Sequence, residues 1–124
     1  MASRVLIADD EANLLISLEY LLQRQGYDVS LARDGDQTMK LIRQQPPDLV
    51  ILDATMPGQS GFEVCQQVRA DPALRHIPIV MLSARARDTD IAKGKALGAD
   101  VYLVKPFSTG DLVNQVRLLL GADQ

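Results

Sequence analysis

A short apolar run that ends on a carboxylate constrains the fold of this chain more than any other stretch. Residues Leu49 to Leu52 are aliphatic and lead directly into Asp53, with the turn residues Pro57 and Gly58 close behind. Such a run is typical of a strand that is buried on both faces, as in a parallel sheet. An ionisable group at the carboxyl end of a central strand lies where open α/β sheets bind their ligands. Taken alone, an aspartate here is more simply explained as a turn residue, so a functional role depends on what other strands bring to the same edge.

Length and composition limit the class of protein. The chain has 124 residues, of which 47% are apolar and 23% charged, and its formal net charge is −3. These values predict one globular domain, residues 1–124, with a real core. The acidic balance provides no electrostatic footprint for nucleic acid. The sequence shows no apolar run that could span a membrane and no signal peptide before Arg4, so we expect a cytoplasmic protein.

Cysteine and histidine chemistry is sparse. The one cysteine, Cys65, excludes an internal disulfide and falls on the apolar side of a predicted helix, which favours a buried, unreactive thiol. The one histidine, His76, lies in a predicted loop. One histidine and one cysteine cannot form a zinc cage.

Strand and helix patterns alternate five times along the chain with short connections. The predicted strands cover residues 4–8, 27–32, 49–52, 78–82 and 101–104. Amphipathic helices are predicted between and after them, and the fourth, residues 89–97, is the weakest because Gly94 lies inside it. This alternation predicts an α/β fold with a doubly wound parallel sheet and helices on both faces. Five strands fit the flavodoxin-like order 2-1-3-4-5 with five helices.

Four of the five predicted strands end in residues that can take part in chemistry. The first is followed by Asp9 and Asp10, the third by Asp53, the fourth by Ser83 and the fifth by Lys105. Each residue has a simple structural explanation, such as a helix cap, a strand end or a solvated charge. In the predicted order these four strands are neighbours and their carboxyl ends share one edge. The coincidence of all five residues at that edge favours a functional site.

Charge balance indicates what this site holds. Like charges about 5 Å apart at an effective dielectric near 20 repel by roughly 3 kcal/mol per pair, and Lys105 offsets only part of this repulsion. A hard divalent cation would offset the rest, and oxygen ligands suit Mg²⁺. The best metal ligands are Asp9 and Asp10, together with a backbone carbonyl near Thr55. With charge balanced, Asp53 can act as a nucleophile and form an aspartyl phosphate.

These residues resemble the receiver domain of response regulators in two-component signalling. The resemblance covers the whole chain and rests on Asp9-Asp10, Asp53-x-x-Met-Pro-x-x-x-Gly, Ser83-Ala and Lys105-Pro-Phe. It implies that Asp53 is the phosphoacceptor and that Asp9, Asp10, Asp53 and the Thr55 carbonyl hold Mg²⁺. It also implies that Ser83 is the switch hydroxyl, that Lys105 pairs with a phosphoryl oxygen, that the Lys105–Pro106 bond is cis and that Tyr102 is the switch aromatic.

The resemblance also implies partners. A histidine kinase or phosphotransfer protein would donate the phosphoryl group, and an unknown downstream protein or fused effector domain would respond through helix 89–97, the last strand and the last helix. A monomer or weak dimer is expected, because Val101 follows Asp100 where regulators that dimerise through this face commonly have a second acidic residue. Thr55 and Arg85 occupy variable positions that tune dephosphorylation, so the lifetime of the phosphorylated state stays open. Such a domain catalyses only its own phosphorylation and dephosphorylation and is not otherwise an enzyme.

Three other classes of protein remain as alternatives. A phosphatase of the haloacid dehalogenase type also uses an aspartate nucleophile with Mg²⁺, but it needs a second aspartate where this chain has Thr55. A flavodoxin-like electron carrier needs a phosphate loop after the first strand, where Asp9 and Asp10 would repel a phosphate. A receiver-like interaction module without phosphorylation would be expected to lack one of the five site residues, and all five are present.

Overall fold

The computed structural model describes residues 2–121, which form five strands and five helices in strict alternation. The strands are β1 (Arg4–Ala8), β2 (Asp28–Ala32), β3 (Leu49–Asp53), β4 (Ile79–Ser83) and β5 (Val101–Val104). The helices are α1 (Ala12–Arg24), α2 (Gly35–Gln44), α3 (Gly61–Ala70), α4 (Asp88–Ala96) and α5 (Thr109–Leu119).

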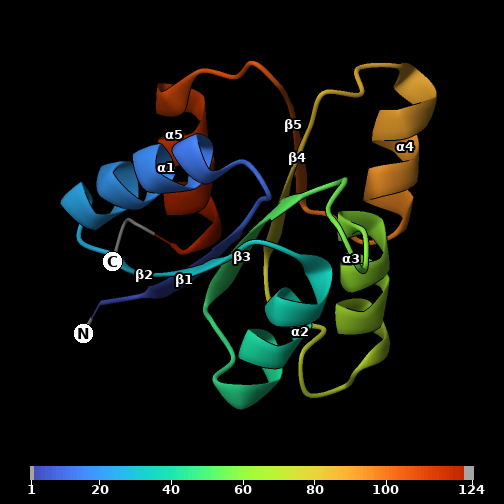
Figure 1. Ribbon diagram of the computed structural model, residues 1–124, viewed down its shortest axis with the longest axis horizontal. Coiled ribbons are helices and arrows are strands. Elements are labelled where there is room, and N and C mark those ends of the chain that lie inside the picture. Colours follow the sequence, from blue (N-terminus) through green and yellow to red (C-terminus); the bar gives the residue numbers. More distant parts are fainter. Residues whose placement is uncertain (1, 122–124) are drawn as a thin grey trace.

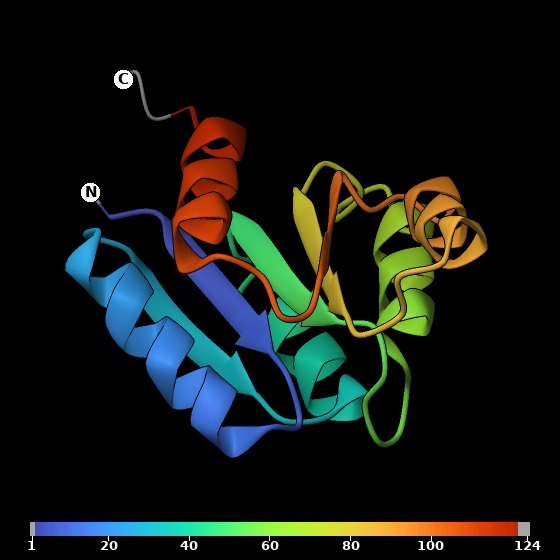
Figure 2. The ribbon, with the colours of Figure 1, turned by 90° about the horizontal axis from the view of Figure 1, so that it is seen from above.

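All strand pairs are parallel, and the strand order is β2-β1-β3-β4-β5. The predicted flavodoxin-like α/β fold is therefore confirmed. Helices α1 and α5 cover one face of the sheet, whereas α2, α3 and α4 cover the other (Figure 1). Seen from above, the arrowheads of the strands lie along the same edge (Figure 2). Residues that follow different strands are thereby brought together at the carboxyl edge.

The core consists of two apolar layers, one on each side of the sheet. Every residue of β3 and β4 is buried, as expected for central strands with helices on both faces. The edge strand β2 alternates exposed and half-buried residues until its buried last residue, Ala32. The most rigidly enclosed strands are thus the two whose last residues are Asp53 and Ser83.

Local signals in the sequence explain where the helices begin. The side chain of Asp34 accepts a hydrogen bond from the N–H of Gln37 at the start of α2. Ser60 and Glu63 form a reciprocal capping box at the start of α3, as their spacing predicts. The predicted second strand is one residue too long, because the N–H of Tyr27 donates to the end of α1 and β2 begins only afterwards.

Within residues 2–121, no helix combines the length and the apolar character needed to cross a membrane.

Candidate functional site

Strand register places the predicted site residues side by side. Asp53 ends β3 and pairs with Leu82, and the next residue of β4 is Ser83. Ser83 in turn pairs with Val104, which is followed directly by Lys105. Asp9 follows the last residue of β1, the other neighbour of β3. The carboxyl edge therefore collects the residues that the sequence predicted for it.

Three carboxylates form the centre of the site. One oxygen from each of Asp9, Asp10 and Asp53 lies within 4.8 Å of the others. Asp9 is fully buried and Asp53 is 4% exposed, whereas Asp10 is exposed at the mouth of the site. Asp9 is also fixed locally, since its Oδ1 accepts a hydrogen bond of 2.9 Å from the N–H of Glu11. Glu11, the first flanking residue of α1, makes no capping bond with its own side chain.

Lys105 joins the cluster from β5. Its Nζ lies 2.9 Å from Asp9 Oδ2 and 3.5 Å from Asp53 Oδ1, so one ammonium group contacts two of the three carboxylates. Burial by itself lowers the pKa of Lys105, but the hydrogen bond to Asp9 and the negative charges of Asp53 and Asp9 outweigh it and raise the pKa. Lys105 is therefore a permanent cation of the site.

The raised pKa of Asp53 shows that the positive charge of Lys105 does not balance the negative charges of the site. Burial, followed by the negative charge of Asp9, raises the pKa of Asp53 from 3.8 to about 7, although Lys105 and a hydrogen bond from the Thr55 backbone act in the opposite direction. At about pH 7 a solvated aspartate would be almost fully ionised. The protein thus holds a carboxylate in a place where its negative charge is under-compensated.

The donor set fits a hard divalent cation. It consists of closely spaced carboxylate oxygens, one of them at the solvent-exposed mouth, and Mg²⁺ prefers oxygen ligands and retains several waters. A divalent charge would remove the excess negative charge that raises the pKa of Asp53. The residues present are therefore suited to Mg²⁺.

A chain of two hydrogen bonds leads from the site to Tyr102 in β5, whose ring packs on α4. The N–H of Arg85 donates to Ser83 Oγ at 3.0 Å, and the Tyr102 hydroxyl donates to the carbonyl of Arg85 at 3.0 Å. Ser83 is buried, and the ring of Tyr102 packs inward against Gly94 of α4. The backbone of Arg85 therefore connects the two residues predicted to act as the switch.

Sequence reasoning missed two clusters of charged residues, one after the end of β4 and one at the opposite, amino edge of the sheet. Asp90 of α4 is buried although charged, and Arg87 and Arg85 approach it to 3.3 and 3.9 Å. Arg69 of α3 donates to three backbone carbonyls and to Asp100, and thus joins the loops before β4 and β5. The basic residues three and five positions before Asp90 are a signal that could have indicated the first cluster. The second joins residues about 30 positions apart and leaves no local pattern.

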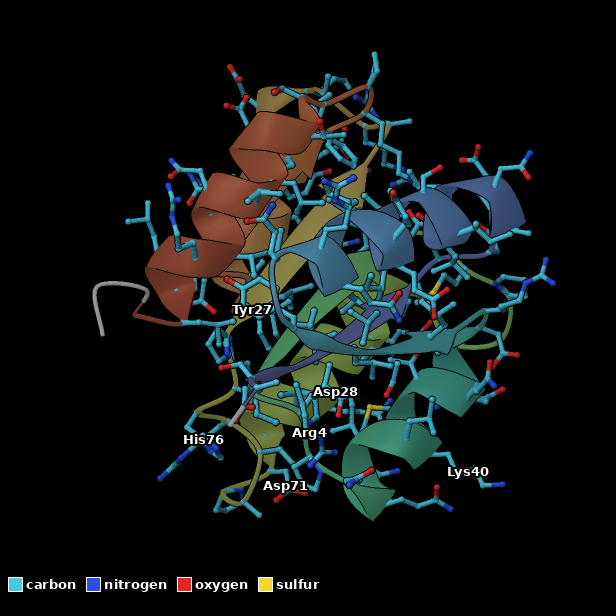
Figure 3. All side chains as sticks on the ribbon, turned by 90° about the vertical axis from the view of Figure 1, so that its left-hand side faces the viewer. Arg4, Tyr27, Asp28, Lys40, Asp71 and His76 are labelled. Atoms are coloured by element: carbon cyan, nitrogen blue, oxygen red, sulfur yellow. The ribbon has the colours of Figure 1, made fainter. Side chains whose placement is uncertain are left out.

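Three further predictions from the sequence concern the cysteine, the histidine and the peptide bond after Lys105. Cys65 is buried, as predicted, and it donates to the carbonyl of Leu97; burial raises the pKa of its thiol to about 11, which disfavours a reactive thiolate. His76 lies in the loop before β4, at the edge of the sheet where the strands begin and near Arg4, the first residue of β1 (Figure 3). The peptide bond between Lys105 and Pro106 is cis, as the resemblance implied.

Comparison with known proteins agrees with this architecture. The family model of the response regulator receiver domain matches residues 5–117, and the chain therefore belongs to that family. A chemotaxis response regulator, CheY4 of Vibrio cholerae, is 32% identical with a TM-score of 0.90, over 97% of this chain and all (100%) of that one. A proposed response regulator from Chloroflexus aurantiacus J-10-fl is 34% identical with a TM-score of 0.92, over 98% of this chain and 99% of that one.

A third related structure holds a metal. It is the receiver domain of the sensor histidine kinase PA1611 from Pseudomonas aeruginosa PAO1, with a magnesium ion coordinated in its active-site cleft. That domain is 27% identical with a TM-score of 0.89, over 98% of this chain and 99% of that one. The present chain is thus a receiver domain of two-component signalling with an acidic site typical of phosphoryl acceptance, a family whose members work with histidine kinases.

Proposed function

We propose that this protein is a phosphorylation-dependent switch that accepts a phosphoryl group on Asp53. The observation that carries the proposal is the cluster of three carboxylate oxygens within 4.8 Å, with a lysine ammonium 3.5 Å from Asp53. The donor is a phosphohistidine on a histidine kinase or phosphotransfer protein, or a small phosphodonor. Asp9, Asp10, Asp53 and the Thr55 carbonyl hold Mg²⁺, which supplies positive charge for the carboxylates and the phosphoryl oxygens.

The chain's own residues act mainly by position. A carboxylate oxygen of Asp53 attacks phosphorus, the new P–O bond forms as the P–N bond of the donor breaks, and the departing imidazole nitrogen keeps the electron pair and takes a proton from solvent. Lys105 neutralises one phosphoryl oxygen. Because phosphoryl transfer needs positioning and charge neutralisation more than covalent chemistry, this small site is sufficient. Attack by water on the same phosphorus releases phosphate and restores the carboxylate.

The response uses the hydrogen bonds beside the site. A phosphoryl group adds about −1.5 to −2 charge and strong acceptor oxygens. Ser83 turns toward it as a donor and thereby releases the N–H of Arg85, whose carbonyl accepts from Tyr102. The affinity of the surface formed by α4, β5 and α5 for a downstream protein or effector domain changes as a result.

Two alternative functions make different predictions. As an interaction module without phosphorylation, the chain would not be labelled, but its intact charge cluster favours chemistry. As a haloacid dehalogenase-type phosphatase, it would turn over phosphate monoesters, but Thr55 stands where the second aspartate is needed, which disfavours that role.

The proposal is tested by intact-mass measurement after incubation with Mg²⁺ and acetyl phosphate. We expect the addition of one phosphoryl group, and we expect none in Asp53→Asn, because the amide is a poor nucleophile. Asp48→Asn, in an exposed aspartate before the same strand, is a matched control and should be labelled like the wild type. Equal labelling of Asp53→Asn would place the phosphoacceptor elsewhere.

A further inference from the structure

The loop between β3 and α3 contains the backbone carbonyl assigned to Mg²⁺ but has no regular secondary structure of its own. Its two ends are fixed by backbone hydrogen bonds of 2.8 Å, from Ala54 to the carbonyl of Leu82 and from Gly61 to the carbonyl of Ala54. The segment between these anchors includes Thr55. What holds that segment therefore decides where the Thr55 carbonyl points.

The first turn of α2 holds the middle of this loop by backbone contact. The N–H of Gly35 donates to the carbonyl of Pro57 at 3.1 Å. A Cβ on Gly35 would overlap the carbonyl oxygen of Gln59, so the two backbones approach as closely as a glycine allows. The loop thus rests directly on the start of a helix that lies beside α3.

A side-chain clamp completes the attachment. Nε2 of Gln59 donates to Asp36 Oδ1 at 3.0 Å, and Oε1 of Gln59 accepts from Nε2 of Gln67 in α3. Asp36 lies in the first turn of α2, where a carboxylate is stabilised by the helix dipole. One loop glutamine is therefore held by an element on either side.

The contacts of Gln59 matter for metal binding because Mg²⁺ is strict about the position of its ligands. Mg²⁺ demands nearly ideal octahedral geometry, so a carbonyl ligand that is held in place before binding costs less to order. We infer that Asp36 and Gln59 are positioning residues that hold the β3–α3 loop with the Thr55 carbonyl directed at the cation. This inference rests on the proposed Mg²⁺ site and extends it to residues that do not touch the metal.

The test measures Mg²⁺ affinity directly. Backbone amide shifts of the full chain are followed by NMR during Mg²⁺ titration, without a phosphodonor. We expect Asp36→Ala, which removes one hydrogen bond of Gln59, to weaken binding by about three- to tenfold, and Gln59→Ala, which also removes the bond to Gln67, to weaken it at least as much. Because Asp36 acts through its bond to Gln59, the double variant should be no weaker than Gln59→Ala alone.

Two matched variants distinguish loss of the hydrogen bond between Asp36 and Gln59 from loss of charge and from the removal of any surface side chain. Asp36→Asn keeps an oxygen acceptor for Gln59 but removes the charge, and Gln66→Ala removes an exposed glutamine next to Gln67. Both should stay within about twofold of the wild type, since neither removes the hydrogen bond. Hydrogen exchange of the loop amides in metal-free protein should be faster in Gln59→Ala and unchanged in Gln66→Ala.

The contrary outcomes are distinct. Wild-type affinity in Gln59→Ala would overturn the positioning role while leaving the Mg²⁺ site in place. Weakening by Asp36→Asn equal to that by Asp36→Ala would also overturn it, because charge alone would then explain the effect. A wild-type protein that does not bind Mg²⁺ at all would instead contradict the proposed function.

Discussion

Helices α3 and α4 lie next to each other on one face of the sheet but are attached in different ways (Figure 1). Five residues of α3 are buried, and its apolar ones pack into the core: Phe62, Val64, Cys65 and Val68. In α4 the buried residues are Asp90 and Gly94, which have no large apolar side chain, and the partly buried Ile91 only adjoins the core.

Helix α4 is held instead by a few specific contacts. The ammonium of Lys93 lies 4.6 Å from the centre of the Phe62 ring, and the Cys65 thiol donates to the carbonyl of Leu97. The Tyr102 ring packs on Gly94. Cation–π and single hydrogen-bond contacts contribute about 0.5–1.5 kcal/mol each, less than burial of a large apolar side chain.

The residues proposed for phosphorylation and the helix proposed for the response differ in how firmly the core holds them. Asp53 and Ser83 end two fully buried strands, so their positions are fixed by the core. Regions with few buried apolar contacts open at low cost, and α4 meets that description. Under the proposed function, the two buried strands hold the charge cluster, and α4, with few buried apolar contacts, is the element that responds.

The largest expected effect sharpens this comparison at the metal site. Asp10→Asn should slow phosphorylation by acetyl phosphate about 10- to 100-fold, because a charged ligand of the cation becomes neutral. Ile91→Ala in α4 should leave the rate within about twofold, since α4 does not supply the reacting groups. Mass spectrometry over time measures both rates. Undiminished phosphorylation in excess EDTA would contradict the metal requirement.

The next effect tests the packing contrast itself. Val68→Ala in α3 should lower the free energy of unfolding by about 2–3 kcal/mol, because its side chain is fully buried and a cavity would remain. Ile91→Ala removes more atoms yet should cost about 1 kcal/mol or less, since Ile91 is only half-buried. Urea unfolding monitored by circular dichroism gives both values. A larger loss for Ile91→Ala would break the comparison.

The fold and the strand-end residues could be predicted from the sequence, whereas the contacts that hold α4 and the loops could not. All ten elements and the five residues at the strand ends follow from apolar patterns and strand order, which are properties of neighbouring residues. The sequence suggested that Gly94 weakens its helix, but the structure shows that it makes room for the Tyr102 ring. The contacts of Arg69 with Asp100 and of Asp36 with Gln59 join distant segments, and no local pattern encodes them.

A smaller effect concerns the cost of the charge cluster. The pKa of Asp53 is raised from 3.8 to about 7, so between these values the folded protein binds more protons than the unfolded one and its stability falls as pH rises. In EDTA at about pH 8, Asp53→Asn should therefore raise the free energy of unfolding by about 1–2 kcal/mol relative to wild type, and at about pH 4 the difference should vanish. Urea unfolding across this range checks it. A gain that is independent of pH would show that ionisation is not its cause.

The smallest effect probes the contact between α4 and β5. Alanine normally stabilises a helix interior relative to glycine by about 1 kcal/mol. A Cβ at Gly94, however, would lie 2.7 Å from Cδ2 of Tyr102, so the ring or the helix must move. We expect Gly94→Ala to forfeit that gain, with a net change within about 0.5 kcal/mol of zero or slightly destabilising. It should also weaken the hydrogen bond from Tyr102 to Arg85.

Gly110 in the first turn of α5 provides the matched control, because a Cβ there would meet only Ser108 Oγ, at an ordinary 3.5 Å. Gly110→Ala should keep part of the helix-propensity gain, a few tenths of a kcal/mol, without moving Tyr102. Ring resonances of Tyr102 in the free and beryllofluoride-bound protein report its position. If Gly94→Ala stabilises the protein as much as Gly110→Ala and leaves these resonances unchanged, α4 and β5 are not coupled through this contact. If the Tyr102 resonances shift in Gly94→Ala alone, while Asp53 is phosphorylated at the wild-type rate, the response has been altered without the chemistry.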